Sequence, residues 1–134
     1  MKRIAVAAAT LALLSLTATA ADVAKKAPEA PRFLILVKGG DRDARTPEEQ
    51  KAVVAEYVAW ARSLKDSGHL VTADELSDKG TCLSEATRAG APCASSAGGF
   101  FLVTAKDAAE ALKLSRGCPS LRHGGSVEVT PIVN

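Results

Sequence analysis

Hydrophobic positions along the chain follow two different periods, and their order predicts the architecture. Continuous apolar runs at residues 33–37 and 100–103 indicate buried strands. Residues 70–76 indicate a further strand, and residues 127–132 alternate well enough for a last one. Because Pro131 lacks an amide donor, it favours an edge position or the end of that strand.

Two segments between these strands have the pattern of helices. Thr46 is suited to cap a helix, Pro47 to occupy its first turn and Glu49 to complete a capping box. Gly68 marks the end of this helix, and residues 107–116 form a second, shorter one. The first helix carries one apolar stripe, made of Val53, Val54, Tyr57, Trp60, Ala61 and Leu64.

The predicted elements follow the order β-α-β-β-α-β, which is typical of the ferredoxin-like α+β fold. In this fold a four-stranded antiparallel sheet carries two helices on one face. Residues 77–97 form a long polar connection between the second and third strands, where we expect no regular element. Since the sequence supplies no layer for the second face of the sheet, we expect a homodimer formed through that face.

The first residues have the three parts of a secretory signal peptide, which we place at residues 1–20. Lys2 and Arg3 form a positive start, an uncharged apolar core follows, and Ala18 and Ala20 suit signal peptidase. The apolar core is shorter than the ~20 residues that a membrane-spanning helix needs. We therefore expect cleavage after Ala20 and export to the bacterial periplasm or the medium, with no stable membrane insertion afterwards.

Cleavage would leave a flexible spacer at residues 21–31 and one domain at residues 32–134. Two of the 17 Lys and Arg residues leave with the leader, so the mature chain balances its 15 Asp and Glu residues and has no net charge. Nucleic-acid binding draws most of its affinity from basic residues. We therefore expect no nucleic-acid partner.

Three cysteines would enter an oxidising compartment on export. Cys82 and Cys93 bracket a short polar loop and form the natural disulfide pair, which leaves Cys118 reduced. The alternative is that Cys118 pairs with one of them or bridges two subunits.

Three side chains are candidates for proton transfer. His69 follows the first helix and His123 precedes the last strand, so each is either a general base or an ordinary turn residue. Glu128 interrupts the apolar residues of the last strand. If Glu128 faces the uncovered side of the sheet, burial there would raise its pKa; otherwise it is an exposed strand residue.

The turn around His123 also offers candidates for ligand binding. Arg116 and Arg122 would bind an anion together with His123, or simply form a solvated basic turn. Cys118 is a reactive thiol if these charges lower its pKa, or a small packing residue. Its place just after a helix favours packing, because the helix dipole disfavours a thiolate there. No His or Cys pair has the spacing of a metal site, and we expect no metal or other cofactor.

Several blocks, taken in order, make the chain similar to the YCII-related (DGPF) family of the dimeric α/β-barrel group. The similarity covers roughly residues 32–133 and implies the ferredoxin-like fold and a homodimer. In the family's ending an arginine often stands where this chain has Thr130. The blocks are residues 33–37, Thr46-Pro47-Glu48-Glu49, Ser67-Gly68-His69-Leu70-Val71, residues 98–103, Gly117-Cys118-Pro119 and residues 124–132.

The chain departs from this family where its namesake segment, Asp-Gly-Pro-Phe-Ala-Glu-Thr-Lys-Glu, would stand. Residues 90–97 read Gly-Ala-Pro-Cys-Ala-Ser-Ser-Ala instead, without an acid or a lysine. The histidine–aspartate pair proposed for the group also has no counterpart. The resemblance therefore implies a fold and a dimer, but no catalytic residues.

Two functions fit these observations, and the sequence does not decide between an enzyme and a binding protein. The first is a noncatalytic or degenerate YCII-like module that binds a small ligand or a partner in the periplasm. The second is a lyase-like or isomerase-like enzyme that uses His69, His123 or Glu128 for proton transfer. The two differ in whether these acid and base residues converge in one pocket on the sheet face.

Overall fold

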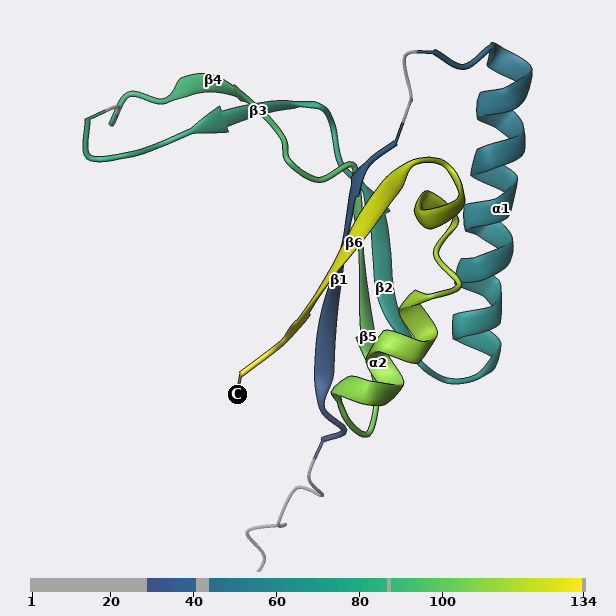
Figure 1. The fold of residues 1–134 in the computed structure, drawn as a ribbon. Helices are drawn as coiled ribbons and strands as arrows, with labels where there is room; N and C mark the ends of the chain where they lie inside the picture. The colour runs from purple at the N-terminus through teal and green to yellow at the C-terminus, as the bar shows by residue number, and fades with distance from the viewer. Residues whose placement is uncertain (1–28, 41–43, 87, 134) are drawn as a thin grey trace, which may run out of the picture.

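The computed structural model describes residues 29–40, 44–86 and 88–133. The predicted signal peptide and nearly all of the predicted spacer lie outside these residues. The described chain forms an antiparallel sheet with two helices on one side, and a long hairpin projects from one end of the sheet (Figure 1). This is the predicted ferredoxin-like α+β arrangement.

Four strands form the main sheet in the order β2-β5-β1-β6, and each neighbouring pair is antiparallel. Their bounds are β1 (Arg32–Gly39), β2 (Leu70–Glu75), β5 (Gly99–Thr104) and β6 (Gly125–Pro131). Strand β6 lies at an edge of this sheet, and Pro131 is its last residue. The edge position predicted from Pro131 is confirmed, because a proline there interrupts no inner ladder.

Two α-helices and one 3-10 helix cover one face of the sheet: α1 (Pro47–Asp66), α2 (Ala108–Ser115) and η1 (Pro119–Arg122). The predicted capping box is present. The Thr46 hydroxyl accepts from the Glu49 amide at 3.2 Å, and the Glu49 carboxylate accepts from the Thr46 amide at 2.7 Å. Gly68 follows α1 with φ +77°, the left-handed conformation that ends many helices.

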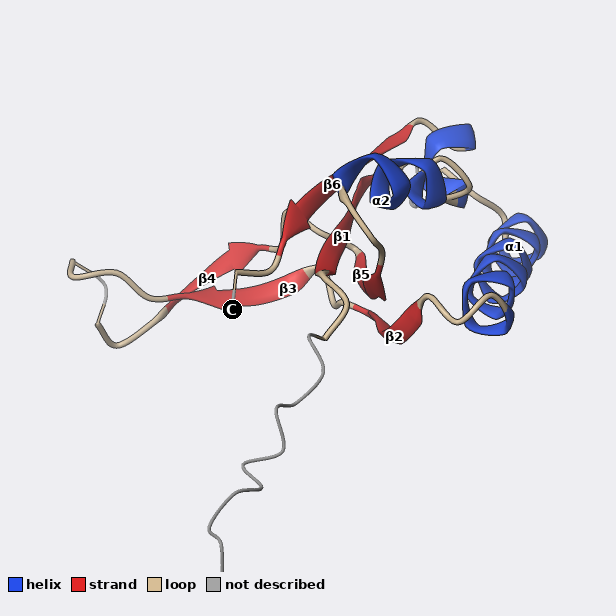
Figure 2. Cartoon of the chain, turned by 90° about the horizontal axis from the view of Figure 1, so that it is seen from below, coloured by secondary structure: helices blue, strands red, loops and turns tan. Residues whose placement is uncertain are grey.

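The core lies between the helices and one face of the sheet. Alternate residues of β1, Phe33, Ile35 and Val37, are buried on this face, where they pack in one cluster with Trp60 and Phe101. Because side chains alternate along a strand, the residues between them point to the opposite face. That face, called here the open face, is covered by no helix in the described part of the chain (Figure 2). By strand register it includes Leu34, Leu36, Phe100 and Leu102, with Lys38, Thr72, Asp74 and Glu128 around them.

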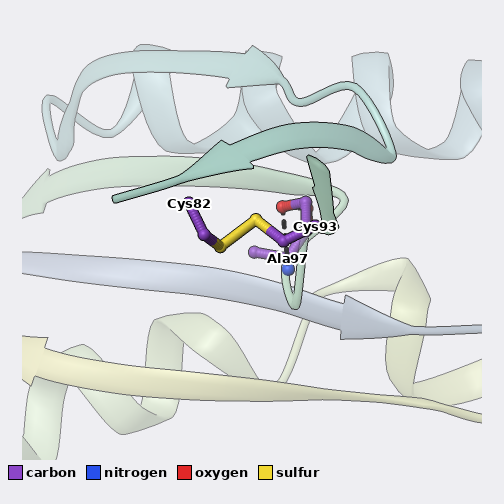
Figure 3. Close-up of a disulfide and its surroundings, with 4 residues drawn as sticks. Cys82, Cys93 and Ala97 are labelled. Atoms are coloured by element: carbon purple, nitrogen blue, oxygen red, sulfur yellow. Dashed lines mark hydrogen bonds between the residues drawn. A yellow bond between two sulfur atoms is a disulfide. The ribbon is translucent and has the colours of Figure 1, made fainter. Parts of the chain in front are cut away.

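The expectation of an irregular connection at residues 77–97 is wrong. This segment contains β3 (Lys79–Cys82) and β4 (Ala91–Ala94), which pair with each other in a separate two-stranded sheet. A disulfide joins Cys82 and Cys93, the pair favoured by the sequence, and their Cα atoms lie 5.7 Å apart (Figure 3). We call the described residues of the range 79–94 the arm. The sequence pattern did not predict its strands, because their residues are small or polar and do not alternate between apolar and polar positions.

The arm projects from the end of the sheet where β2 leads out and β5 begins. In both views it points away from the side on which α1 and α2 lie (Figures 1 and 2). Among the described residues, neither of its strands pairs with the main sheet. No helix of the described chain is long and apolar enough to cross a membrane.

Candidate functional site

The best-formed cavity of the described chain is a cleft of about 280 Å³ between α1 and the sheet. Helix α1 forms one wall, the β2 edge of the sheet forms the other, and η1 closes one end. We call this cavity the cleft. Its lining includes Val37, Gly40, Arg45, Gln50, Val53, Val54, Tyr57, Val58, Ala61, Ala73, Glu75, Gly99, Phe101 and His123.

The wall formed by α1 is apolar and partly uncovered. Val54 and Val58 are 47% and 53% exposed although they lie on the side of the helix that lines the cleft. On the same helix, Trp60 and Leu64 are buried in the core, whereas Val53 is buried and also lines the cleft. The apolar surface of α1 is therefore wider than the core needs, and the surplus faces the cleft.

Polar groups gather at the end of the cleft next to the start of α1. Arg45, Gln50 and His123 all line it there, and the Arg45 guanidinium donates to the Gln50 amide oxygen at 3.4 Å. A methyl group placed on Gly40 would lie 3.6 Å from the His123 carbonyl oxygen and 3.8 Å from Arg45 Nη2. The Gly40 backbone therefore lies beside both basic residues at this end of the cleft.

The opposite wall carries an acidic group. Glu75 pairs with Gly99 across the β2–β5 ladder, and Gly99 is buried on the helix-covered face. Directly opposed residues of an antiparallel pair share a face, so Glu75 points to the cleft side of the sheet. A methyl group on Gly99 would lie 3.0 Å from the Asp74 carbonyl oxygen, so glycine keeps this part of the wall free of strain.

A small ion-pair network fixes η1 against α1 behind the polar end of the cleft. Arg122 Nη2 donates to Glu56 at 2.7 Å, and His123 Nε2 lies 3.2 Å from the same carboxylate. Hydrogen bonding to Arg122, then to His123, holds the pKa of Glu56 below its usual range. The network positions His123, because its ring contacts the carboxylate of Glu56 on α1, the helix that also forms a wall of the cleft.

The depressed pKa of Glu56 predicts a pH-dependent contribution to stability. A carboxylate with a lowered folded-state pKa stabilises the fold fully above its unfolded pKa of about 4.3, and this stabilisation disappears as the pH falls through the folded value. Urea denaturation should show Glu56→Gln less stable than wild type at pH about 7. The difference should shrink below pH about 4.

A double-mutant cycle isolates this contribution from other effects of the substitution. Arg122→Gln should lower stability in the same pH window. The double variant should be little less stable than Glu56→Gln alone, because the ion pair is already lost. A deficit of Glu56→Gln that is the same at neutral and acid pH would rule out the ion pair as its cause.

The structure does not bring the three proton-transfer candidates together. The ring nitrogen Nδ1 of His69 donates to the Thr104 carbonyl at 2.8 Å, and Thr104 pairs with the first residue of β1. His123 lies beside Gly40, just past the other end of that eight-residue strand. At ~3.3 Å per residue, the two histidines stand roughly 25 Å apart along the sheet.

Glu128 lies on the open face, as one of its two interpretations required, but its pKa is not raised. Its carboxylate forms an ion pair with Lys38 on the neighbouring strand β1. The hydrogen bond to Lys38 lowers the pKa of Glu128, and burial opposes this only weakly. Glu128 therefore faces away from the cleft and is a poor proton acceptor near neutral pH.

The remaining candidates are also separated. Cys118 is fully buried in the core, and burial raises the pKa of its thiol, so the packing role applies. Arg122 is bound to Glu56 and lies 58% exposed, whereas Arg116 is an exposed residue at the C-cap of α2. Of the sequence candidates for ligand binding or proton transfer, only His123 lines the cleft.

Comparison with protein-family models identifies the family of this chain. The model of the YCII-related domain matches residues 31–134, which is most of the chain. The chain belongs to the YCII-related family. Comparison with curated proteins finds no match. The site of this YCII-related domain must therefore be interpreted from its own residues.

Sequence reasoning missed most of this YCII-related site, although one signal was present. Val58 extends the apolar stripe of α1 beyond the width that one core contact requires. Arg45, Gln50 and Glu75 carry no such signal. They become neighbours only because β1, α1 and β2 meet at one end of the sheet.

Proposed function

We propose that this YCII-related domain binds a small organic ligand in the cleft and has no catalytic role there. The observation that carries the proposal is the cleft itself, an apolar cavity of about 280 Å³ with convergent polar groups at one end. Small-molecule sites are typically apolar cavities of ~300–1,000 Å³ with a few polar groups that orient the ligand. The volume of this cleft is just below the lower limit of that range.

The lining favours a ligand with an apolar body and one polar or anionic end. Val54, Val58 and Phe101 offer apolar contact along the cleft, while Arg45 and His123 offer donors at its end. Arg is well suited to carboxylate and sulfonate-like groups because its donors are arranged in a planar fork. Glu75, on the facing wall, suits a hydrogen-bond donor on the ligand.

The separation of the acid and base residues supports binding over catalysis. Proton-transfer catalysis needs an acid or base within hydrogen-bond reach of the reacting group. His69 and His123 lie at opposite ends of the sheet, and Glu128 lies on its other face. His123 is moreover bound to Glu56 on the outer side of the cleft. Among the described residues, the three candidates of the lyase-like or isomerase-like alternative therefore do not assemble one site.

The proposal is tested with 8-anilinonaphthalene-1-sulfonate, a fluorescent probe with an aromatic body and an anionic end. Wild type should bind one probe per chain. Val54→Trp should weaken binding by about tenfold or more, because the indole occupies the cleft mouth. Val54 is already 47% exposed, so the fold tolerates the larger side chain.

Ala55→Trp provides the matched control for this experiment. Ala55 is exposed on the same turn of α1 but does not line the cleft, so the same indole there should leave the affinity unchanged. Equal affinity of both tryptophan variants and wild type would contradict binding in the cleft.

We further propose that the chain is exported and that its leader is removed near Ala20. The charged start, apolar core and small residues of the first 20 residues support this. The disulfide between Cys82 and Cys93 is also compatible with an oxidising compartment. N-terminal sequencing of protein from the periplasm should begin at or near Ala21, and a sequence that begins at Met1 would contradict export by this route.

We also propose that two copies associate through their open faces. Leu34, Leu36, Phe100 and Leu102 make this face apolar at its centre, and no helix of the described residues covers it. Two sheets packed face to face would bury these side chains at a separation of ~10 Å. The oligomeric state of the mature chain tests this directly.

A further inference from the structure

We propose that the arm of each protomer clasps the other protomer in the open-face dimer. The inference rests on the proposed dimer and concerns a part of the chain that the cleft does not use. The arm extends past the sheet on the side that the helices leave uncovered (Figures 1 and 2). A second copy stacked on the open face would therefore lie directly alongside it.

The arm would add contact area to a dimer formed through the open face. Four strands of six to eight residues, spaced ~4.8 Å apart with ~3.3 Å per residue, give a footprint of roughly 450 Å². A standard stable interface buries ~800 Å² on each partner. Accessible area exceeds the planar footprint of the same surface, so the sheet face and the arm on the same side together suit an interface of this size.

The length of the arm suits this role. Half of residues 79–94, at ~3.3 Å per residue, reach roughly 26 Å from the sheet, whereas packed sheets are separated by only ~10 Å. The arm is therefore long enough to pass alongside the sheet of a second copy. Two-fold symmetry would place the second arm in the same way on the first copy, giving an interface that closes on itself.

The composition of the arm also indicates a contact outside its own chain. Leu83, directly after β3, is 71% exposed, and the two arm strands pair only with each other among the described residues. An isolated two-stranded hairpin is marginal in water, yet this one is held in shape by a disulfide. A preordered arm loses less conformational entropy on association than a flexible loop would.

The test measures the dimer dissociation constant of the mature, oxidised chain by sedimentation equilibrium. Leu83→Ser should raise it by about tenfold or more, because two copies of the leucine leave the interface together. Leu112→Ser is the matched control, since Leu112 is 51% exposed on α2 in the helix layer, away from the open face. It should leave the dissociation constant unchanged.

A photocrosslink provides a second readout that does not depend on affinity. Benzoylphenylalanine in place of Leu83, in dimers mixed from ¹⁴N- and ¹⁵N-labelled chains, should give crosslinks between light and heavy peptides. A stable dimer unaffected by Leu83→Ser, or crosslinks confined to one chain, would overturn the clasp and leave the dimer standing. A monomeric wild type would overturn both proposals.

Discussion

Replacement of Trp60 by alanine is expected to lower the free energy of unfolding by about 3–5 kcal/mol. Trp60 is 8% exposed, and its ring centroid lies 4.4 Å from that of Phe101 in the sheet. A methyl group on Gly117 would lie 2.8 Å from the indole nitrogen, so the backbone after α2 packs directly on the ring. Loss of the indole would leave a cavity between three elements.

This loss is large compared with the net stability of ~5–15 kcal/mol that is typical of small domains. Far-UV circular dichroism should follow the urea denaturation, because Trp60 is the single tryptophan and its fluorescence is lost with it. Val58→Ala, at a 53% exposed position of the same helix, should cost less than about 1 kcal/mol. A comparably small cost for Trp60→Ala would contradict the described core.

Loss of the disulfide is expected to raise the amide exchange rates of the arm by a factor of about 100. The exchange rates of the core should change little. Cys82 and Cys93 are 11 residues apart, and closing a loop of that size is worth about 2.5–3 kcal/mol in the chain-entropy model. Each 1.4 kcal/mol corresponds to about a tenfold change in an opening equilibrium. Because the arm strands do not pair with the main sheet, this change falls mainly on the arm.

Hydrogen exchange followed by mass spectrometry measures arm and core separately in one sample. In the Cys82→Ser, Cys93→Ser double variant, peptides from β3 and β4 should exchange much faster than in the oxidised wild type. Peptides from β1 and β5 should keep their protection. Faster exchange of equal size in all four strands would show that arm and core unfold together, contrary to this account.

The parts of the fold predicted correctly are those determined by local sequence. The capping box at Thr46 and Glu49 forms between residues three apart, so short-range pattern is sufficient to find it. The buried run of β1 and the stop at Gly68 also follow from local period and backbone preference. These elements, taken in order, predict the ferredoxin-like arrangement.

The arm shows where local pattern fails. Its four-residue strands include Gly80 and Pro92, and glycine and proline are depleted in strands. The pairing is supported by a disulfide between two residues that are 11 positions apart. The sequence suggested this disulfide. A disulfide alone, however, does not show that the residues around the two cysteines form the paired strands of a hairpin.

The cleft was missed for a different reason. A hydrophobic stripe indicates that a helix face is covered, but not whether the protein core or a ligand covers it. Trp60 is buried in the core, whereas Val54 on the same helix is 47% exposed and lines the cleft. The distinction depends on how far α1 stands from β2, which is a property of the assembled fold.

The most direct test of ligand binding in the cleft is to map the contact site by NMR. The ¹⁵N-labelled mature chain is titrated with 8-anilinonaphthalene-1-sulfonate, and the amide shifts of the two sheet faces are compared. We predict that the largest changes occur at cleft residues such as Val54, Val58 and Gly99, with little change at Leu34 and Leu36. Shifts concentrated at Leu34 and Leu36 on the open face, with the cleft residues unchanged, would contradict the proposal.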